Sequence, residues 1–238
     1  MTHAPAVRVL SLVLHLAVGL VLFAGCTDDT DPPWQLDHDR IIAVRATPPR
    51  VAPGERAVID GLVGAKGAPV AEGPADALTV TSPAALAGAL TRDGARWIVT
   101  APGEADLAAA RAGLGLAAGA PVPLALEASY GSLRATKTVW LGASAANPAM
   151  VDIDIDHAGM PTAPIAITAL RDVPMAIALD DVRYDITWLS SCGTMHDFDL
   201  PSAYLRIEAD DPRSGQLVLV VRDDGGGVNW RIWDIAAP

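Results

Sequence analysis

Val151-Asp152-Ile153-Asp154-Ile155-Asp156 is the stretch of this sequence that decides the fold class, since apolar and acidic side chains alternate along it without a break. Successive side chains of a β-strand point to opposite faces, so we expect the three apolar side chains on one face and the three aspartates on the other. A strand with one buried and one solvated face is typical of antiparallel sheets. The stretch therefore predicts a half-buried strand in an all-β protein.

Similar short segments, separated by Pro and Gly, continue to the C-terminus and predict a β-sandwich over residues 148–238. Its further strands are expected at Pro164–Ala169, Met175–Leu179, Val182–Leu189, Tyr204–Ala209, Gln216–Arg222 and Val228–Ile235. Alternation in the strand from Val182 puts Trp188 on the apolar face, where we expect it to anchor the core. The last two strands meet at Gly225-Gly226-Gly227, which can supply the positive φ angles of a tight hairpin. About seven strands is the usual count for an immunoglobulin-like sandwich.

A first sandwich is expected over residues 40–142, where short alternating segments again follow one another. Its strands are expected at Ile41–Ala46, Arg56–Val63, Leu78–Thr81, Arg96–Thr100, Val122–Tyr130 and Leu133–Leu141. The last two should form a hairpin at Gly131, with Leu124 and Leu126 on the buried face. A short helical insertion is predicted at Glu104–Arg111, because acids begin this alanine-rich run and an arginine ends it. Residues 143–148 are interpreted as a linker between the two domains.

The first 25 residues have the layout of an export signal. Arg8 precedes an uncharged run from Val9 to Ala24, which is shorter than the roughly 20 apolar residues that a membrane-spanning helix needs. We expect cleavage after Gly25; the alternatives are an ordinary signal peptide with a chance cysteine and an uncleaved anchor. Residues 26–39 carry aspartates and prolines without apolar periodicity and predict an acidic tether.

Phe23-Ala24-Gly25-Cys26 resembles a lipobox, the motif at which bacterial lipoproteins are acylated on cysteine and then cleaved. The resemblance implies a signal peptide at residues 1–25 and a membrane anchor made of lipid on Cys26. Thr27 stands where the family's inner-membrane retention signal is an aspartate, so the resemblance favours the outer membrane. Phe23 departs from the family's usual leucine. With Cys26 lipidated, Cys192 would have no partner for an intramolecular disulfide.

The rest of the chain resembles bacterial immunoglobulin-like and polycystin-type (PKD-like) extracellular domains. In residues 40–142 the resemblance rests on Pro48–Glu55, which leads into a strand; in residues 148–238 it rests on Trp188, Gly193 and the segment Gly215–Asp223. It implies two tandem immunoglobulin-like β-sandwich domains. The sequence departs from antibody domains in lacking their bridging cysteine pair, and the helical insertion is not standard for such a domain.

The charge balance narrows the class of partner. Seventeen Lys and Arg residues stand against 28 Asp and Glu, which gives a net charge of −11 at pH 7. A surface of this sign repels phosphate backbones. Nucleic acid is therefore not an expected partner, whereas a membrane, reached through lipid on Cys26, and envelope or extracellular proteins or glycans are.

Few residues have a spacing that supports catalysis or metal binding. The sequence has no Gly-x-Ser-x-Gly elbow, no phosphate loop before a helix and no His pair at zinc-ligand spacing. Cys192 near Ser190 and His196 allows a nucleophile, with a buried structural thiol as the alternative. Calcium is the stronger candidate ligand, with a solvated strand face as the alternative. Its candidate ligands are Asp152, Asp154, Asp156, Asp223 and Asp224, together with Asp197 and Asp199.

Tryptophans bear on possible binding surfaces. Trp97, Trp188 and Trp230 fall where alternation predicts burial, whereas Trp140 and Trp233 allow either an exposed aromatic patch or packing at a strand edge or the domain junction.

We predict a non-enzymatic surface lipoprotein that acts as a binding or structural module of the cell envelope, in adhesion or assembly, without a cofactor. The alternative is a calcium- or carbohydrate-binding accessory domain of an extracellular system.

Overall fold

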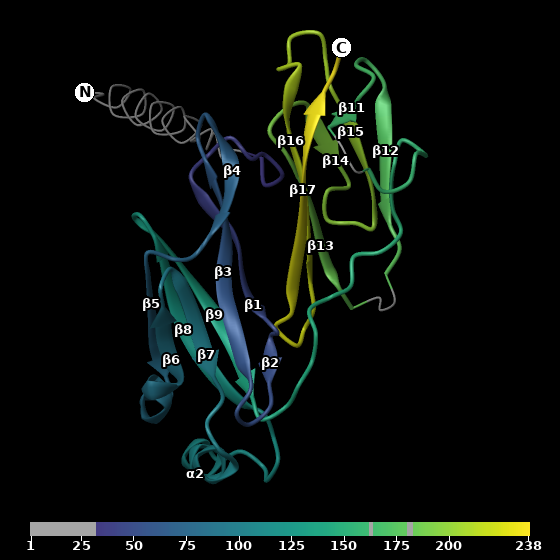
Figure 1. Cartoon of the computed structure of the whole chain (residues 1–238). Coiled ribbons are helices and arrows are strands. Elements are labelled where there is room, and N and C mark those ends of the chain that lie inside the picture. Colours follow the sequence, from purple (N-terminus) through teal and green to yellow (C-terminus); the bar gives the residue numbers. More distant parts are fainter. Residues whose placement is uncertain (1–31, 162–163, 180–182) are drawn as a thin grey trace, which may run out of the picture. The chain divides into compact units, whose positions relative to one another are not determined.

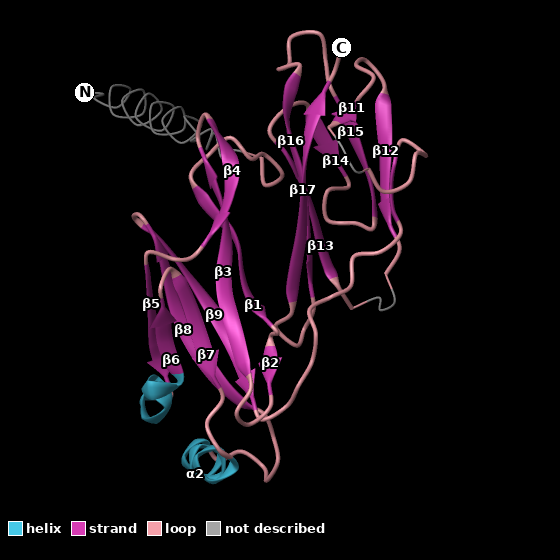
Figure 2. Ribbon diagram, viewed as in Figure 1, coloured by secondary structure: helices cyan, strands magenta, loops and turns pink. Residues whose placement is uncertain are grey.

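The computed structural model describes residues 32–161, 164–179 and 183–238, and this part of the chain is mostly β-structure (Figures 1 and 2). The predicted signal peptide, the lipobox and Cys26 lie outside the described residues. Within the described ranges, no helix is long and apolar enough to cross a membrane. The strands are assembled into four sheets, and most of their pairings are antiparallel. The predicted β-rich fold class is therefore confirmed.

Residues 40–141 form two sheets, which we call the first sheet pair. Sheet I has the order β1 (Arg40–Thr47), β3 (Arg56–Ala65), β7 (Arg96–Thr100) and β6 (Leu90–Asp93), with β4 (Ala68–Gly73) paired to β3. Sheet II has the order β2 (Arg50–Val51), β9 (Leu133–Leu141), β8 (Val122–Tyr130) and β5 (Ala77–Ser82). All six strands predicted in this region are present, whereas β2, β4 and β6 have no counterpart among the predicted strands.

Residues 153–236 form the second sheet pair. Sheet III has the order β11 (Ile165–Ala166), β17 (Val228–Ala236), β16 (Ser214–Arg222) and β13 (Asp185–Ser190). Sheet IV has the order β10 (Ile153–Ile155), β12 (Asp172–Ile177), β15 (Ser202–Arg206) and β14 (Thr194–His196). Of these strands only β14 was not anticipated by the alternation in the sequence.

The first core lies between sheets I and II. Leu124 and Leu126 on β8 are fully buried and the intervening Ala125 is not, as the alternation predicts. Strands β8 and β9 pair up to Tyr130 and Leu133, and Gly131 turns the chain at a φ of +58°. Burial of each such leucine contributes about 2 kcal/mol of transfer free energy.

The helical insertion is present as α2 (Glu104–Leu114). Glu104 in its first turn forms an ion pair with Arg111, whose side chain is buried and whose Nε also donates to the carbonyl of Ala120 at 2.6 Å. Gly115 ends the helix in the left-handed conformation that glycine adopts without strain. A short 3-10 helix, η1 (Ala84–Ala89), follows β5 and was not predicted.

The second core lies between sheets III and IV and is anchored by Trp188, as predicted. Trp188 is fully buried, and its Nε1 donates to the carbonyl of Leu200 at 3.1 Å. Ile153 and Ile155 also face this core. The prediction is wrong for Val151, which is 55% exposed. Strand β10 begins only at Ile153 because Asp152 takes a positive φ of 52°, which interrupts the extended backbone.

A third apolar cluster, which we call the junction cluster, lies between sheets I and III. It includes Leu62 of β3 and Val218 and Val220 of β16, all fully buried. Because Leu217 and Leu219 point into the second core, β16 is buried on both faces. Figure 1 shows β1 and β17 running alongside one another at this place. Residues 33–238 consequently form one compact unit, and the two sheet pairs share apolar surface instead of being joined by a linker alone.

Candidate functional site

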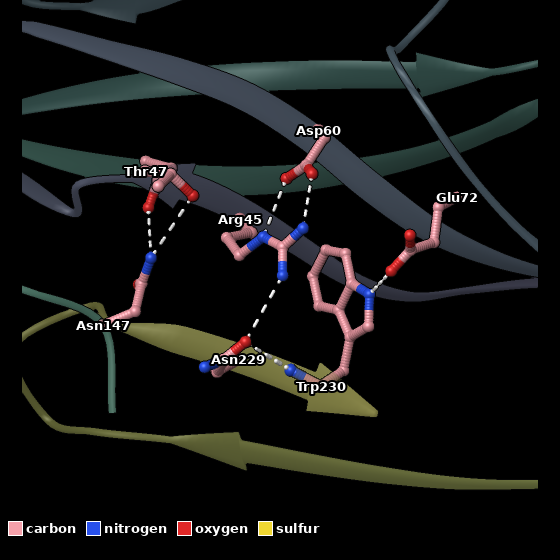
Figure 3. A network of polar contacts seen from close by, with 8 residues as sticks. Arg45, Thr47, Asp60, Glu72, Asn147, Asn229 and Trp230 are labelled. Atoms are coloured by element: carbon pink, nitrogen blue, oxygen red, sulfur yellow. Dashed lines mark hydrogen bonds and ion pairs between the residues drawn. The ribbon is translucent and has the colours of Figure 1, made fainter. Parts of the chain in front are cut away.

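Arg45 on β1 connects the two sheet pairs beside the junction cluster. It lies opposite Asp60 in the β1–β3 register, and its Nε and Nη2 donate to the two carboxylate oxygens at 3.1 and 2.6 Å. Its Nη1 lies 3.3 Å from Oδ1 of Asn229, and its guanidinium carbon lies 3.7 Å from the centroid of the Trp230 ring. Figure 3 shows the guanidinium between Asp60 and Trp230. A bidentate carboxylate and a stacked indole together hold the guanidinium in one geometry.

Trp230 on β17 is the largest side chain of the junction cluster, with only 3% of its surface exposed. Its Nε1 donates to the carboxylate of Glu72 on β4 (Figure 3). A second contact from β4 reaches sheet III, where the backbone N–H of Val70 donates to Oε1 of Gln216 at 2.7 Å. The sequence predicted burial of Trp230 in a core, and the structure places it between the sheet pairs.

Asn147 joins the predicted linker to both sheet pairs. Its Nδ2 donates to the carbonyl of Ala46 at 2.9 Å, and its Oδ1 accepts the backbone N–H of Val228 at 2.9 Å. Asn229 donates through Nδ2 to the carbonyl of Pro148 at 3.0 Å. The stretch 143–148 was expected to be a plain linker, and its C-terminal part is instead fixed in the junction.

The hairpin Asp223–Gly227, between β16 and β17, packs against the first sheet pair. Arg50 donates from Nε to the carbonyl of Gly225 at 3.3 Å, and Lys137 donates from Nζ to the carbonyl of Gly226 at 2.5 Å. A Cβ at Gly225 would lie 2.1 Å from Nη2 of Arg50. Of the three glycines in this hairpin, only Gly226 has a positive φ, of 85°. The hairpin prediction is confirmed, and a side chain at 225 would displace the Arg50 guanidinium from its place against the hairpin.

The chain enters the compact unit along this junction. Gln35 forms a parallel bridge with Ser190 of β13, and Leu36, 2% exposed, belongs to the junction cluster. Asp37 and Asp39 accept the backbone N–H groups of Gly67 and Lys66 in the β3–β4 turn. Residues 26–39 were expected to be a tether. Of this range, the part from residue 34 onward packs against both sheet pairs, because Leu36 is buried in the junction cluster and the partly buried Trp34 packs against the second core.

The predicted calcium ligands lie in three separate segments of the chain. Asp152, Asp154 and Asp156 lie in and around β10 of sheet IV, Asp197 and Asp199 lie between β14 and β15, and Asp223 and Asp224 lie in the β16–β17 hairpin. Asp154 accepts the N–H of Gly159 at 2.8 Å, and Asp156 forms an ion pair with Arg171. Within the described ranges, no group of three or more His, Cys, Asp or Glu side chains is close enough to hold one metal ion. Calcium binding by these residues stays a prediction.

Cys192 is a free and buried thiol, 3% exposed. Burial is the main cause that raises the pKa of this thiol above its usual value. Ser190 is also buried, and its hydroxyl donates to the carbonyl of Cys192 at 2.6 Å and accepts the N–H of the same residue. The thiolate is the reactive form of cysteine, so this environment lowers its reactivity at neutral pH. The contacts match the structural-thiol alternative.

Trp140 and Trp233 do not form an exposed patch in the structure. Trp233 is 8% exposed and belongs to the second core, while Trp140 is half-buried beside Gly226 of the hairpin. These positions agree with the alternative in which both rings pack at a core or at the domain junction.

An exposed aromatic ring lies elsewhere: Tyr204 on β15 is 42% exposed and is paired in register with Pro174 and His196 on its two sides. The sequence pattern gave no signal for this row on the outer face of sheet IV.

Comparisons with known proteins yield no family. No protein-family model matches the sequence, and no curated protein matches it. Among solved structures, a nucleoside hydrolase-related hypothetical protein from Saccharophagus degradans is 15% identical over 40% of this chain and 26% of its own, with a TM-score of 0.31. The tandem Ig repeats of Dlar are 12% identical over 84% of this chain and 98% of theirs, with a TM-score of 0.29. A C-terminal fragment of intimin, solved with the intimin-binding domain of its translocated receptor, is 13% identical over 84% of this chain and 64% of its own, with a TM-score of 0.28.

Proposed function

We propose that this chain is a non-enzymatic surface lipoprotein whose two sheet pairs are tandem immunoglobulin-like β-sandwich domains. Its role would be that of a binding or structural module of the cell envelope, in adhesion or assembly with other envelope or extracellular proteins or glycans. The observation that supports this most is the packing of Trp34 and Leu36 at the junction of the two sheet pairs. A lipid on Cys26 would thereby hold both pairs as one body.

The length of chain between the lipid and the junction limits how far the body can stand from a membrane. Eight residues lead from Cys26 to Trp34, and at full extension they span about 29 Å. Several acyl chains on one cysteine hold a protein stably, because each buried methylene contributes about 0.8 kcal/mol. Thr27 after the cysteine supports the outer membrane as the site of attachment. The module would then act close to a bilayer.

The outer face of sheet IV is the proposed recognition surface. Tyr204 presents an aromatic ring with a polar hydroxyl, and Leu170 and Leu200, at 56% and 49% exposure, lie in the segments that lead into β12 and β15 of the same sheet. Tyrosine is enriched at protein interfaces because one side chain combines apolar area with a hydrogen-bonding group. A partner protein that covers this face would bury the Tyr204 ring.

The anchor is tested by the mass and the location of the protein. In cells that process lipoproteins, the membrane-extracted protein should have the mass of residues 26–238 plus acyl chains, and Cys26→Ser should shift it from the membrane pellet to the soluble fraction. Cys192→Ser is the matched control and should leave the protein in the pellet. A membrane fraction unchanged by Cys26→Ser, or a mass that retains residues 1–25, would contradict the proposal.

The recognition surface is tested with a photo-crosslinking residue in intact cells. A crosslinker at Tyr204 should give one discrete adduct, whereas the same residue at Thr79, which is exposed on β5 in sheet II, should give none. Competition by an excess of the purified chain should abolish the adduct, and purified chain that carries Tyr204→Ala should compete less well. Equal adducts at both positions would show nonspecific encounters and would overturn this assignment.

A further inference from the structure

A cavity of about 370 Å³ lies in the junction between β1, β9 and the β16–β17 hairpin. Its walls are formed by the apolar segment Ile41–Val44, by the hydroxyl-bearing residues Thr136 and Thr138, and by the glycine backbone of the hairpin. Three charged side chains line it: Lys137 from the first sheet pair, and Arg222 and Asp223 from the second. Its charged groups therefore come from both sheet pairs.

Lys137 occupies a position where the strand pattern calls for an apolar side chain. It lies on the same face of β9 as the buried Val139 and Leu141, and only 7% of its surface is exposed. Its Nζ donates to one neutral acceptor, the carbonyl of Gly226. Among the ion pairs formed by the described residues, none includes Lys137. Burial, as the largest cause, lowers the pKa of this ammonium group to about 8; the charge of Arg222 acts in the same direction, and those of Asp223 and Asp60 oppose it.

Arg222 is the second cation of the cavity and also has neutral partners. Its Nη1 donates to Oγ1 of Thr187 at 3.2 Å, and its Nη2 donates to the carbonyl of Ile42 at 2.7 Å. Burial lowers its pKa from the usual arginine value. Asp223, the one acid that lines the cavity, accepts the N–H of Gly227 at 2.7 Å, which engages one of its two carboxylate oxygens with the hairpin backbone.

The charges of Asp223 and Asp60 act on Lys137 and that of Asp185 acts on Arg222, but no carboxylate is in ion-pair contact with either cation among the described residues. Their charge is therefore only partly compensated, and burying charge costs free energy unless it is compensated. We propose that the junction cavity binds a small oxyanion, held by the ammonium of Lys137 and the guanidinium of Arg222. The ligand class is a carboxylate, a phosphate or a sulfate, because both cations favour these oxygens. As one cation belongs to each sheet pair, the bound oxyanion would strengthen the junction.

Oxyanion binding in the junction cavity requires neither the lipid anchor nor a partner at sheet IV. The two cations of the cavity contrast with the rest of the chain, whose net charge is −11. A surface of this sign disfavours the approach of any anion, so binding would depend on the local charges of Lys137 and Arg222, and the volume of the cavity admits only a small one.

The test follows Lys137 directly by NMR. The chain has two lysines, so the full chain labelled with ¹³Cε-lysine and purified in a non-ionic detergent gives two signals, from Lys66 and Lys137. Sulfate, phosphate and acetate are titrated separately into chloride buffer at constant ionic strength. We expect a saturable shift of the Lys137 signal and a rise of its pKa by about one unit, with Lys66 unchanged. The anion that acts at the lowest concentration identifies whether the ligand carries sulfate, phosphate or carboxylate.

Thermal unfolding gives a second, independent readout. At one hundred times the dissociation constant the oxyanion should raise the melting temperature of the wild-type chain by at least about 5 °C. Lys137→Met should lose this rise, whereas the matched variant Lys66→Met, at an exposed position, should keep it. An equal rise in all three chains would be a general salt effect and would overturn the proposal, as would a Lys137 signal that no oxyanion shifts.

Discussion

The guanidinium of Arg45 and the indole of Trp230 stack across the junction, with 3.7 Å between the guanidinium carbon and the ring centroid. One residue belongs to sheet I and the other to sheet III, and the ring is almost fully buried. The same guanidinium is held from the opposite side by Asp60. This stack ties two cores that the chain connectivity alone would leave independent, so its energetic coupling can be measured across the junction.

A double-mutant cycle of Arg45→Ala and Trp230→Leu should give a coupling free energy of about 2 kcal/mol in urea unfolding, because the stack is desolvated. The control is the pair Arg92 and Trp97, where an exposed arginine lies 5.0 Å from its ring centroid within one sheet pair. That pair should couple by about 0.5 kcal/mol. Equal coupling in the two cycles would contradict a special role for the junction stack.

Gly225→Ala should reduce the free energy of unfolding by about 1 kcal/mol, because the added methyl group would push the flexible end of Arg50 away from its hydrogen bond to the carbonyl of Gly225. In an Arg50→Ala background the same change should cost clearly less. Gly88→Ala, where a Cβ would meet no atom within 4 Å, serves as the control and should be nearly neutral. A cost at Gly225 that does not depend on Arg50 would show that the hairpin itself, and not its docking, requires the glycine.

Lys137→Met should stabilise the chain at pH 7 in chloride buffer by an amount on the order of 3 kcal/mol, since the folded-state pKa is about 8 instead of 10.5. Between these two pH values the unfolded chain binds more protons than the folded one, so the stability of the wild-type chain rises with pH. The advantage of the variant should therefore be full below pH 8 and shrink toward pH 10. Urea unfolding at pH 7 and at pH 9.5, with Lys66→Met as the control, measures it. A difference that stays constant with pH would be contrary to this expectation.

Cys192 should react with a thiol reagent only as fast as the chain opens, because the thiol is buried and its pKa is raised. Labelling of the Cys26→Ser chain, which keeps one thiol, should be at least 100-fold slower in the native state than in urea, a ratio set by the small open population. Mass spectrometry over time gives both rates. Rapid native labelling would instead indicate an accessible and activated thiol, and would reopen the nucleophile hypothesis.

The period of two in the sequence was sufficient to locate most strands, since alternation reports burial of one face. It identified β8 and β9 to the residue and placed Trp188 in a core. It could not reveal the junction cluster, because a strand such as β16 that is buried on both faces has a continuous apolar run with no indication of what covers the second face. Val151 was misplaced because a positive φ at Asp152 leaves no signature in the alternation.

The polar part of the junction was equally hidden from the sequence. Arg45 and Asp60 are paired on neighbouring strands of sheet I, but Asn229 is far away along the chain, and only the packing of sheets I and III brings it to Arg45. Lys137 gave one usable signal, since a lysine at an inward position of an otherwise apolar strand face is unusual. Arg222, the second cation of the cavity, lies at the end of a strand, where a charged residue is ordinary.

The distance between the two outer sheets reports directly on whether the junction holds the two sheet pairs as one rigid body. Spin labels at Thr79 in sheet II and Tyr204 in sheet IV, both exposed, can be placed in a chain whose own cysteines are replaced. If the junction makes the two sheet pairs one rigid body, pulsed electron paramagnetic resonance should give a single narrow distance distribution, which broadens in the Trp230→Ala variant. A broad or multiple distance distribution in the chain with an unaltered junction would contradict a rigid junction, because the sheet pairs would then move independently.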